Sequence, residues 1–200
     1  MKQQTLSLLA VLATLSCRES GPVPVPAGNP AGGGPATAPA PADVPARSGK
    51  LFFEAQPGWT EEKPASTMRV AQYSLPRAEG DSEDGELAVF ANIGGAPEDN
   101  LARWASQFEQ PDGRPSSAVA VTPAPEKRGE LVIHKIEVTG TFVAETMPGS
   151  GVRRNEPNWR LLGAVVESPY GPYFFKLVGP DATLRHWKDS FEAFLKSMKP

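Results

Sequence analysis

Two histidines are the residues of this chain best suited to acid–base or metal chemistry near neutral pH. His134 falls on the apolar side of an alternating stretch, where a polar ring needs a hydrogen-bond partner, so we interpret it as a structural histidine. His186 precedes Trp187 on the polar side of a predicted helix and is expected to face solvent. Two isolated histidines do not supply the ligands of a usual zinc site. The sequence also holds no nucleophile elbow or glycine-rich phosphate loop, so we assign no catalytic, metal-binding or cofactor-binding residue from it.

The acidic segment of residues 79–86 is a second candidate for chemistry. Its oxygen-bearing side chains alternate around glycines, as they do at the start of a calcium loop. Such a loop ends in a bidentate glutamate at its twelfth position, but counting from Asp81 places Asn92 there. The segment also leads directly into a predicted strand. We therefore favour a solvated hairpin loop over a calcium site.

Four aromatic residues near predicted strand edges and turns could form an exposed binding patch: Trp59, Trp159, Tyr170 and Tyr173. Most aromatic side chains in such positions pack into the core or its rim, because their large apolar surface is costly to leave in water. We therefore favour a packing role for these four residues.

The apolar spacing predicts a domain of the α+β class, an antiparallel β-sheet with helices packed on it. Alternating or continuous apolar stretches predict strands over residues 69–75, 87–92, 131–142, 160–166 and 173–178. A helix is predicted from Pro97 to the break at Pro111, with Phe108 on its apolar stripe. A second amphipathic helix begins near Thr183 and is expected to bury Trp187 against the sheet.

Composition divides the chain into a folded domain and an extension. Residues 51–200 are expected to form a single α+β domain, whereas residues 17–50 are rich in proline, alanine and glycine without any helical or strand period. Such a stretch favours an extended, disordered tether, although short Pro-x-x-Pro matches leave a recognition role open. The chain has 23 acidic and 20 basic residues, so its overall field does not attract nucleic acid.

The N-terminus has the pattern of an export signal. Lys2 precedes the largely apolar residues 5–15, which are too few to span a bilayer as a helix, and Ser16-Cys17 follows. This order resembles the lipobox of bacterial lipoproteins, with Thr14 where that family usually has leucine. The resemblance implies a signal peptide over residues 1–16 and a diacylglycerol anchor with palmitate-type acyl chains on Cys17. An ordinary secretory signal with an incidental cysteine is the alternative.

The lipobox resemblance also suggests an address in the cell envelope. Arg18 stands where many inner-membrane lipoproteins have aspartate, so the resemblance favours the outer membrane, with the domain facing the periplasm or the exterior. The anchor would make the membrane a partner of the chain through Cys17. The single cysteine allows no intrachain disulfide, so the domain must be stabilised by its core.

Two further resemblances concern the domain. It resembles uncharacterised lipoproteins of planctomycetes and myxobacteria through the segments 68–71, 100–104, 107–108 and 171–177, Met-Arg-Val-Ala, Asn-Leu-Ala-Arg-Trp, Gln-Phe and Gly-Pro-Tyr-Phe-Phe-Lys-Leu. The closing hairpin with Phe191-x-x-Phe194-Leu195-x-Ser197 looks like the end of a PsbP-like domain, which implies an α/β/α sandwich. Neither resemblance implies a reaction.

The sequence therefore favours a membrane-anchored envelope lipoprotein with a non-catalytic binding or interaction domain, which would take an envelope protein or a small ligand. An accessory or assembly factor of an envelope complex is one alternative, by analogy with PsbP-like proteins. An envelope hydrolase with an unrecognised site is another.

Overall fold

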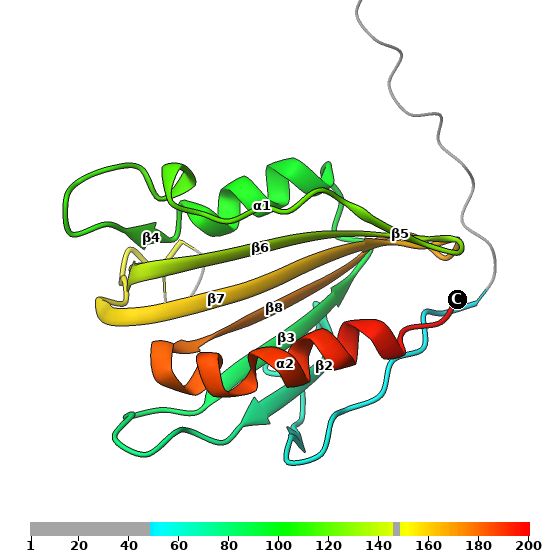
Figure 1. Cartoon of the computed structure of the whole chain (residues 1–200), viewed down its shortest axis with the longest axis horizontal. Helices are drawn as coiled ribbons and strands as arrows, with labels where there is room; N and C mark the ends of the chain where they lie inside the picture. The colour runs from blue at the N-terminus through cyan, green and yellow to red at the C-terminus, as the bar shows by residue number, and fades with distance from the viewer. Residues whose placement is uncertain (1–48, 146–148) are drawn as a thin grey trace, which may run out of the picture. The chain divides into compact units, whose positions relative to one another are not determined.

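Eight β-strands and two α-helices build residues 49–145 and 149–200, the part of the chain that the computed structural model describes (Figure 1). The predicted signal peptide, Cys17 with its predicted lipid, and nearly all of the predicted tether lie outside the described residues. All described residues belong to one compact unit. Within them, no helix has the length and apolar character that a membrane crossing needs.

The strands form one antiparallel sheet in the order β1-β2-β3-β8-β7-β6-β4, and β5 also pairs with β6. In chain order the strands are β1 (Thr60–Glu61), β2 (Arg69–Leu75), β3 (Gly85–Ala91), β4 (Phe108–Glu109), β5 (Glu126–Arg128), β6 (Leu131–Phe142), β7 (Glu156–Glu167) and β8 (Tyr173–Pro180). The helices are α1 (Pro97–Ala105) and α2 (Asp181–Ser197), with a short 3-10 helix, η1 (Ser116–Ala118), between β4 and β5. The predicted α+β class is confirmed.

The helices cover opposite faces of the sheet, so the domain has three layers (Figure 1). The helix α2 packs on β7 and β8, and α1 packs on β6 and β7 from the other side. Each interface has its own apolar core, because alternate residues of a strand point to opposite faces. On β7, for example, Leu162 and Ala164 belong to the α2 core, whereas Leu161 and Val165 belong to the α1 core.

Gly163 lets α1 lie close to the centre of the sheet. The ring of Trp104, which is 2% exposed, lies directly over this glycine. A Cβ atom at position 163 would stand 2.8 Å from the Trp104 ring and equally close to Ile136. The glycine therefore provides the space that a large helix side chain fills.

The predicted first helix is too long at its C-terminal end. The helix α1 ends at Ala105, and Phe108 belongs to β4, where it pairs with Phe142 of β6. The two rings pack with centroids 5.2 Å apart. Phe108 thus reaches the same apolar core from a strand, which the helical spacing of apolar residues could not distinguish from one more helical turn.

The helix α2 is held by a cluster of aromatic rings around Phe194. This side chain is fully buried and has ring contacts with five others, those of Phe53, Trp59, Tyr73, Phe175 and Phe191. The predicted burial of Trp187 was too high, since its side chain is only partly buried and packs at the rim of this core. Its indole Nε1 donates a hydrogen bond to the carbonyl oxygen of Pro76 at 2.8 Å, which explains why it stays near the surface.

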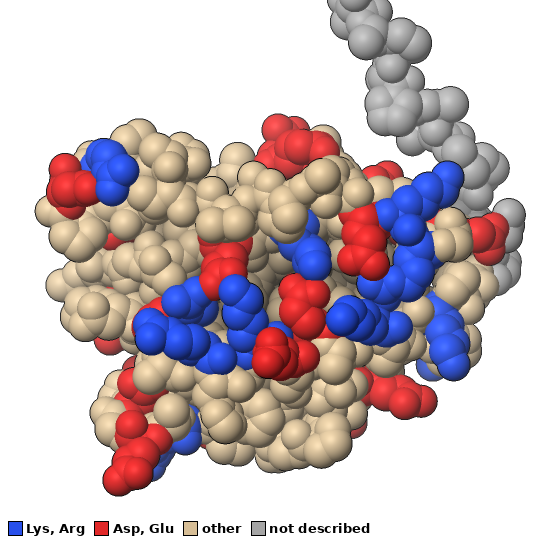
Figure 2. Space-filling model, in the orientation of Figure 1, with Lys and Arg blue, Asp and Glu red and all other residues tan. Residues whose placement is uncertain are grey.

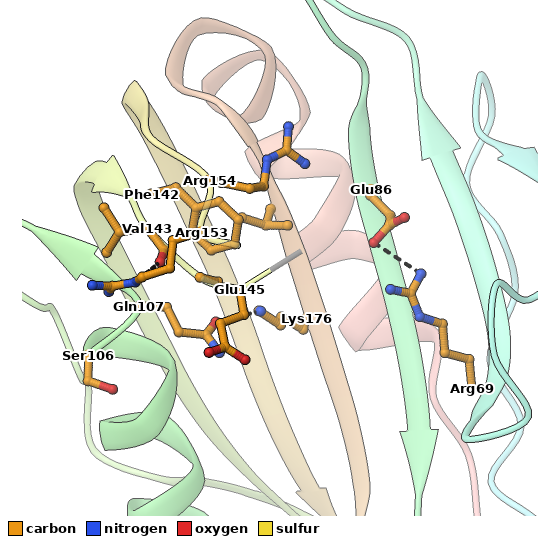
Figure 3. A pocket seen from close by; sticks show the side chains of 12 residues that line it. Arg69, Glu86, Ser106, Gln107, Phe142, Val143, Glu145, Arg153, Arg154 and Lys176 are labelled. Atoms are coloured by element: carbon orange, nitrogen blue, oxygen red, sulfur yellow. Dashed lines mark hydrogen bonds and ion pairs between the residues drawn. The ribbon is translucent and has the colours of Figure 1, made fainter. Parts of the chain in front are cut away.

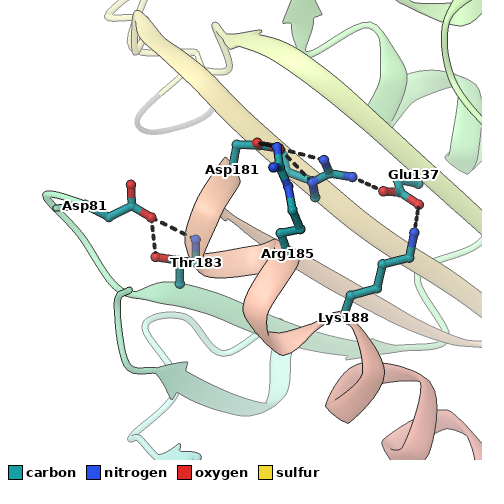
Figure 4. A network of polar contacts seen from close by, with 7 residues as sticks. Asp81, Glu137, Asp181, Thr183, Arg185 and Lys188 are labelled. Carbon is teal, nitrogen blue, oxygen red and sulfur yellow. Dashed lines mark hydrogen bonds and ion pairs between the residues drawn. The ribbon is translucent and has the colours of Figure 1, made fainter. Parts of the chain in front are cut away.

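Polar contacts fix the first turns of α2 against the sheet (Figure 4). The Asp81 carboxylate accepts hydrogen bonds from the backbone N–H and the hydroxyl of Thr183, at 2.8 and 2.6 Å. Arg160 of β7 pairs with Asp181 at the start of the helix and with Glu137 of β6. A carboxylate at a helix N-terminus accepts from free N–H groups and interacts favourably with the helix dipole, so Asp81 stabilises the first turn of α2.

We predict that Phe194→Ala costs about 3–5 kcal/mol of unfolding free energy, since it empties the centre of the α2 core. Trp187→Ala should cost clearly less, because that ring is already partly in water. Urea denaturation of both variants measures the difference. Equal losses would show that Trp187 belongs to the core as fully as Phe194.

Candidate functional site

The structure gives His134 the partner that the sequence analysis expected. The ring lies on β6 at 8% exposure, with Nε2 at 2.7 Å from the Glu167 carboxylate and Nδ1 at 3.4 Å from that of Glu98. His134 therefore ties β6 to β7 and to α1. The interpretation as a satisfied structural histidine is confirmed.

His186 is exposed on α2, beside the Trp187 ring, as expected. It belongs to the helix on the α2 side of the sheet, whereas His134 belongs to the α1 side, so the two rings do not share a site. Among residues 49–145 and 149–200, the histidines and carboxylates form no group of three or more that could hold a metal ion.

The acidic segment is the loop of the β2–β3 hairpin, as predicted, but its carboxylates are not simply solvated. Asp81 binds Thr183 at the start of α2, and Asp84 accepts hydrogen bonds from the Ser74 hydroxyl and the Arg77 N–H, each at 3.0 Å. Glu83 pairs with Arg154 at 2.8 Å. These carboxylates point to different partners, so the segment works as a set of structural contacts and not as a calcium loop.

The aromatic residues proposed as a patch are mostly core residues. Trp59, Trp159 and Tyr173 are 9%, 5% and 8% exposed, and only Tyr170 is partly exposed at the β7–β8 turn. The preference for packing over an exposed patch is therefore confirmed for the three buried rings.

Charged residues on the α2 side neutralise one another. Figure 2 shows cations and anions interleaved across the middle of the view, where α2 meets the sheet. Lys135 pairs with Glu192 at 3.0 Å, and Lys188 pairs with Glu137 at 2.6 Å. Each of these two cations has a carboxylate partner, so these ion pairs hold α2 against the sheet.

The α1 side of the sheet has a cleft, because α1 covers β6 and β7 but leaves the neighbouring strands β8, β3 and β2 without a helix. The cleft has a volume of about 650 Å³, within the usual range for small-molecule sites. Residues from β2, β3, β6, β8 and the segments after α1 and β6 line it: Arg69, Glu86, Ser106, Gln107, Phe142, Val143, Ala144, Glu145, Arg153, Arg154, Lys176 and Val178 (Figure 3).

Lys176 lies on the floor of this cleft. It occupies the middle of β8, where its neighbours in the sheet are Ala88 of β3 and Gly163 of β7. These small neighbours lie on the same face as Lys176, since directly paired residues of an antiparallel sheet share a face. Ala88 leaves room beside the long side chain of Lys176, whereas the Trp104 ring covers Gly163.

The arginines of the cleft are paired, and Lys176 is not. Arg69 pairs with Glu86 across β2 and β3 at 3.0 Å, and Arg154 pairs with Glu83 and lies 4.5 Å from the Trp159 ring centroid. Arg153 donates to the carbonyl oxygen of Val143 at 2.8 Å. In the described ranges, no carboxylate lies within ion-pair distance of the Lys176 ammonium; its polar contact is the neutral amide oxygen of Gln107, at 2.5 Å.

The surroundings of Lys176 disfavour its charged form. Burial, together with the positive charges of Arg103 and Arg69, lowers the pKa of the Lys176 ammonium from 10.5 to about 8, while Glu86 opposes the shift. The Phe142 ring, whose centroid is 5.4 Å from Nζ, gives partial compensation through its π-face. At neutral pH the cleft therefore holds an ammonium ion that is short of negative charge.

Sequence reasoning missed Lys176, although one signal was present. The strand reads Phe174, Lys176, Val178 on one face and Tyr173, Phe175, Leu177 on the other, which is apolar on both faces except for this lysine. A lysine at an interior position of a two-sided strand is rare unless it is paired or functional.

Comparison with known proteins adds no relative to this picture. No protein-family model matches the chain, and no curated protein sequence matches it.

We predict that Lys176→Met stabilises the domain at pH 7 by on the order of 1 kcal/mol, because it removes an ion that burial disfavours and keeps a chain of similar length. In the wild type the native pKa is below that of the unfolded chain, near 10.5, so the penalty applies below pH 8 and fades as the pH rises from 8 to 10.5. Urea denaturation of both proteins across this range measures the gap. A gap that stays constant with pH would contradict the shifted pKa.

Proposed function

We propose that this chain is a lipid-anchored envelope protein whose α+β domain is a non-catalytic binding module, with the α1-side cleft as its ligand site. The main support for the proposal is the environment of Lys176. Its ammonium ion has no carboxylate partner among the described residues and lies on the floor of a cleft of about 650 Å³. A buried charge is costly unless something pairs with it, and since no described carboxylate pairs with the Lys176 ammonium, a ligand would be its partner.

The sheet supports this role because it makes the floor of the cleft rigid. Lys176 and Glu86 are in adjacent strands of the central sheet, and each strand is hydrogen-bonded on both sides. Residues on such strands keep their positions better than residues on loops, so the domain presents a preformed site. A preformed site loses less conformational entropy on binding.

The N-terminal segment supports the address. A short apolar stretch before Ser16-Cys17, followed by a proline-rich region, is the arrangement of a lipid anchor joined to a domain by a spacer. Two or three acyl chains hold a protein stably at a bilayer, since each buried methylene contributes about 0.8 kcal/mol. Binding would then take place close to the membrane surface, on the periplasmic or exterior side.

We predict that Cys17→Ser either moves the protein from the detergent phase to the aqueous phase or leaves its signal peptide uncleaved in a bacterial host that processes lipoproteins, because serine accepts no diacylglycerol. Phase partitioning and mass spectrometry of the mature N-terminus measure this. Ser16→Ala, which keeps a small residue before the cysteine, is the matched control and should stay in the detergent phase. Unchanged partitioning of Cys17→Ser with a cleaved signal peptide would reject the anchor.

The binding role is tested with residues 49–200 and a small-molecule extract of bacterial cells. We predict that the extract shifts the NMR signals of Lys176, Gln107 and Arg69, because they line one cleft, and that the bound compound is recovered unchanged. His186 and Lys188 on the α2 side serve as internal controls and should not shift. An extract that perturbs no cleft signal would reject the binding module.

A further inference from the structure

The cleft groups with free hydrogen-bonding capacity determine which ligand the cleft can bind, which rests on the function proposed above for the cleft. The ammonium of Lys176 has three N–H donors, and its one described hydrogen-bond acceptor is the Gln107 amide oxygen. The amide nitrogen of Gln107 is a neighbouring donor on the same side chain. Together these groups present adjacent N–H donors to the cleft.

The balance of charged groups in the cleft favours a ligand with a single negative charge. Two cations, Arg69 and Arg103, act on the Lys176 ammonium at the floor of the cleft. Glu86 is the carboxylate that opposes their effect. Glu86 already pairs with Arg69 at 3.0 Å, and the Arg103 guanidinium is exposed and donates to the Asn100 amide oxygen. The desolvated, uncompensated charge is thus that of one ammonium.

The wall beside Lys176 is apolar. Phe142, Val143 and Val178 line the cleft, and the Phe142 ring centroid is 5.4 Å from the Lys176 Nζ. Figure 3 shows the Phe142 ring and Val143 on the same side of the cleft as Gln107. A ligand that is charged all over would leave this wall without contacts. A ligand with an apolar body would cover it and gain about 25 cal/mol for each Å² of apolar surface removed from water.

We propose that the cleft binds a small organic carboxylate with an apolar body, whose carboxylate pairs with the Lys176 ammonium and accepts from the Gln107 amide nitrogen. The body lies against Phe142, Val143 and Val178. The remaining charged groups that line the cleft, Glu145, Arg153 and Arg154, lie on the segments that flank it.

The experiment uses 4-phenylbutanoate as the probe, its neutral amide as the isostere without charge, and inorganic phosphate as the anion without an apolar body. NMR titration of residues 49–200 to millimolar concentrations gives the Kd of each. We expect 4-phenylbutanoate to bind at least tenfold more tightly than the amide and than phosphate, because each lacks one of the two recognised features. Equal binding of the amide or of phosphate would overturn the proposal.

Two variants locate the charge. Lys176→Met should weaken 4-phenylbutanoate binding about tenfold to a hundredfold, the usual loss when a charge-assisted hydrogen bond is removed. Lys188→Met is the matched control, because it removes a lysine from the α2 side while Glu137 keeps Arg160 as its partner, and it should leave the Kd unchanged. Unchanged binding in Lys176→Met would overturn the assignment.

The pH dependence gives a second readout. Binding should weaken as the pH rises above 8, because the free ammonium loses its proton there while the carboxylate stays ionised. A Kd that is constant from pH 7 to 10 would contradict the ion pair. If no probe binds but cell extract still perturbs the cleft, the carboxylate is the wrong ligand class and the binding module stands; if the extract also fails, the proposed function itself is rejected.

Discussion

The unequal cover of the two faces of one sheet is the constraint on which the rest of this structure depends. The helix α2 has 17 residues and α1 has nine, which at about 1.5 Å per residue makes them roughly 26 and 14 Å long. Both faces of the central strands β7 and β8 carry apolar residues, so both need cover. The short helix covers β6 and β7 on its side and leaves the face over β8, β3 and β2 open to a cleft.

The part of the sheet face that α1 leaves uncovered carries charged and polar residues. They pair with one another because the cleft does not fully solvate them. Arg69 and Glu86 pair with each other, and the amide of Gln72 joins them through contacts to both side chains. Lys176 differs, because its position between Ala88 and Gly163 leaves it in the hollow with a neutral partner. The same glycine seats Trp104, so the residue that allows α1 to pack also borders the space around the lysine.

Much of the sheet could be predicted from the sequence, because its long strands carry a clear period. The bounds predicted for β2 and β6 match the structure, and those of β3, β7 and β8 differ by a few residues at one or both ends. The strands β1, β4 and β5 have two or three residues each, which is too short for any period to show. Phe108 was misassigned for this reason, since β4 directly follows α1 and continues its apolar stripe.

The site was harder to predict than the fold. The alternation in β8 marks Lys176 as unusual, but its surroundings are formed by the pairing of β8 with β3 and β7, which places Ala88 and Gly163, 75 positions apart in the chain, on either side of it. Strand order and register of this kind come from the packing of the whole sheet and not from local pattern. The acidic segment shows the converse: its spacing suggested a ligand, and its carboxylates instead bind Thr183, Ser74 and Arg154.

The most direct test of this account is the titration of Lys176 itself, followed by NMR through the signals of its Cε and Nζ atoms in residues 49–200. We predict a pKa of about 8, because the ammonium is desolvated and lacks a carboxylate partner among the described residues. A pKa near 10.5, the ordinary value for lysine, would mean that the side chain is solvated or paired and would contradict the central claim.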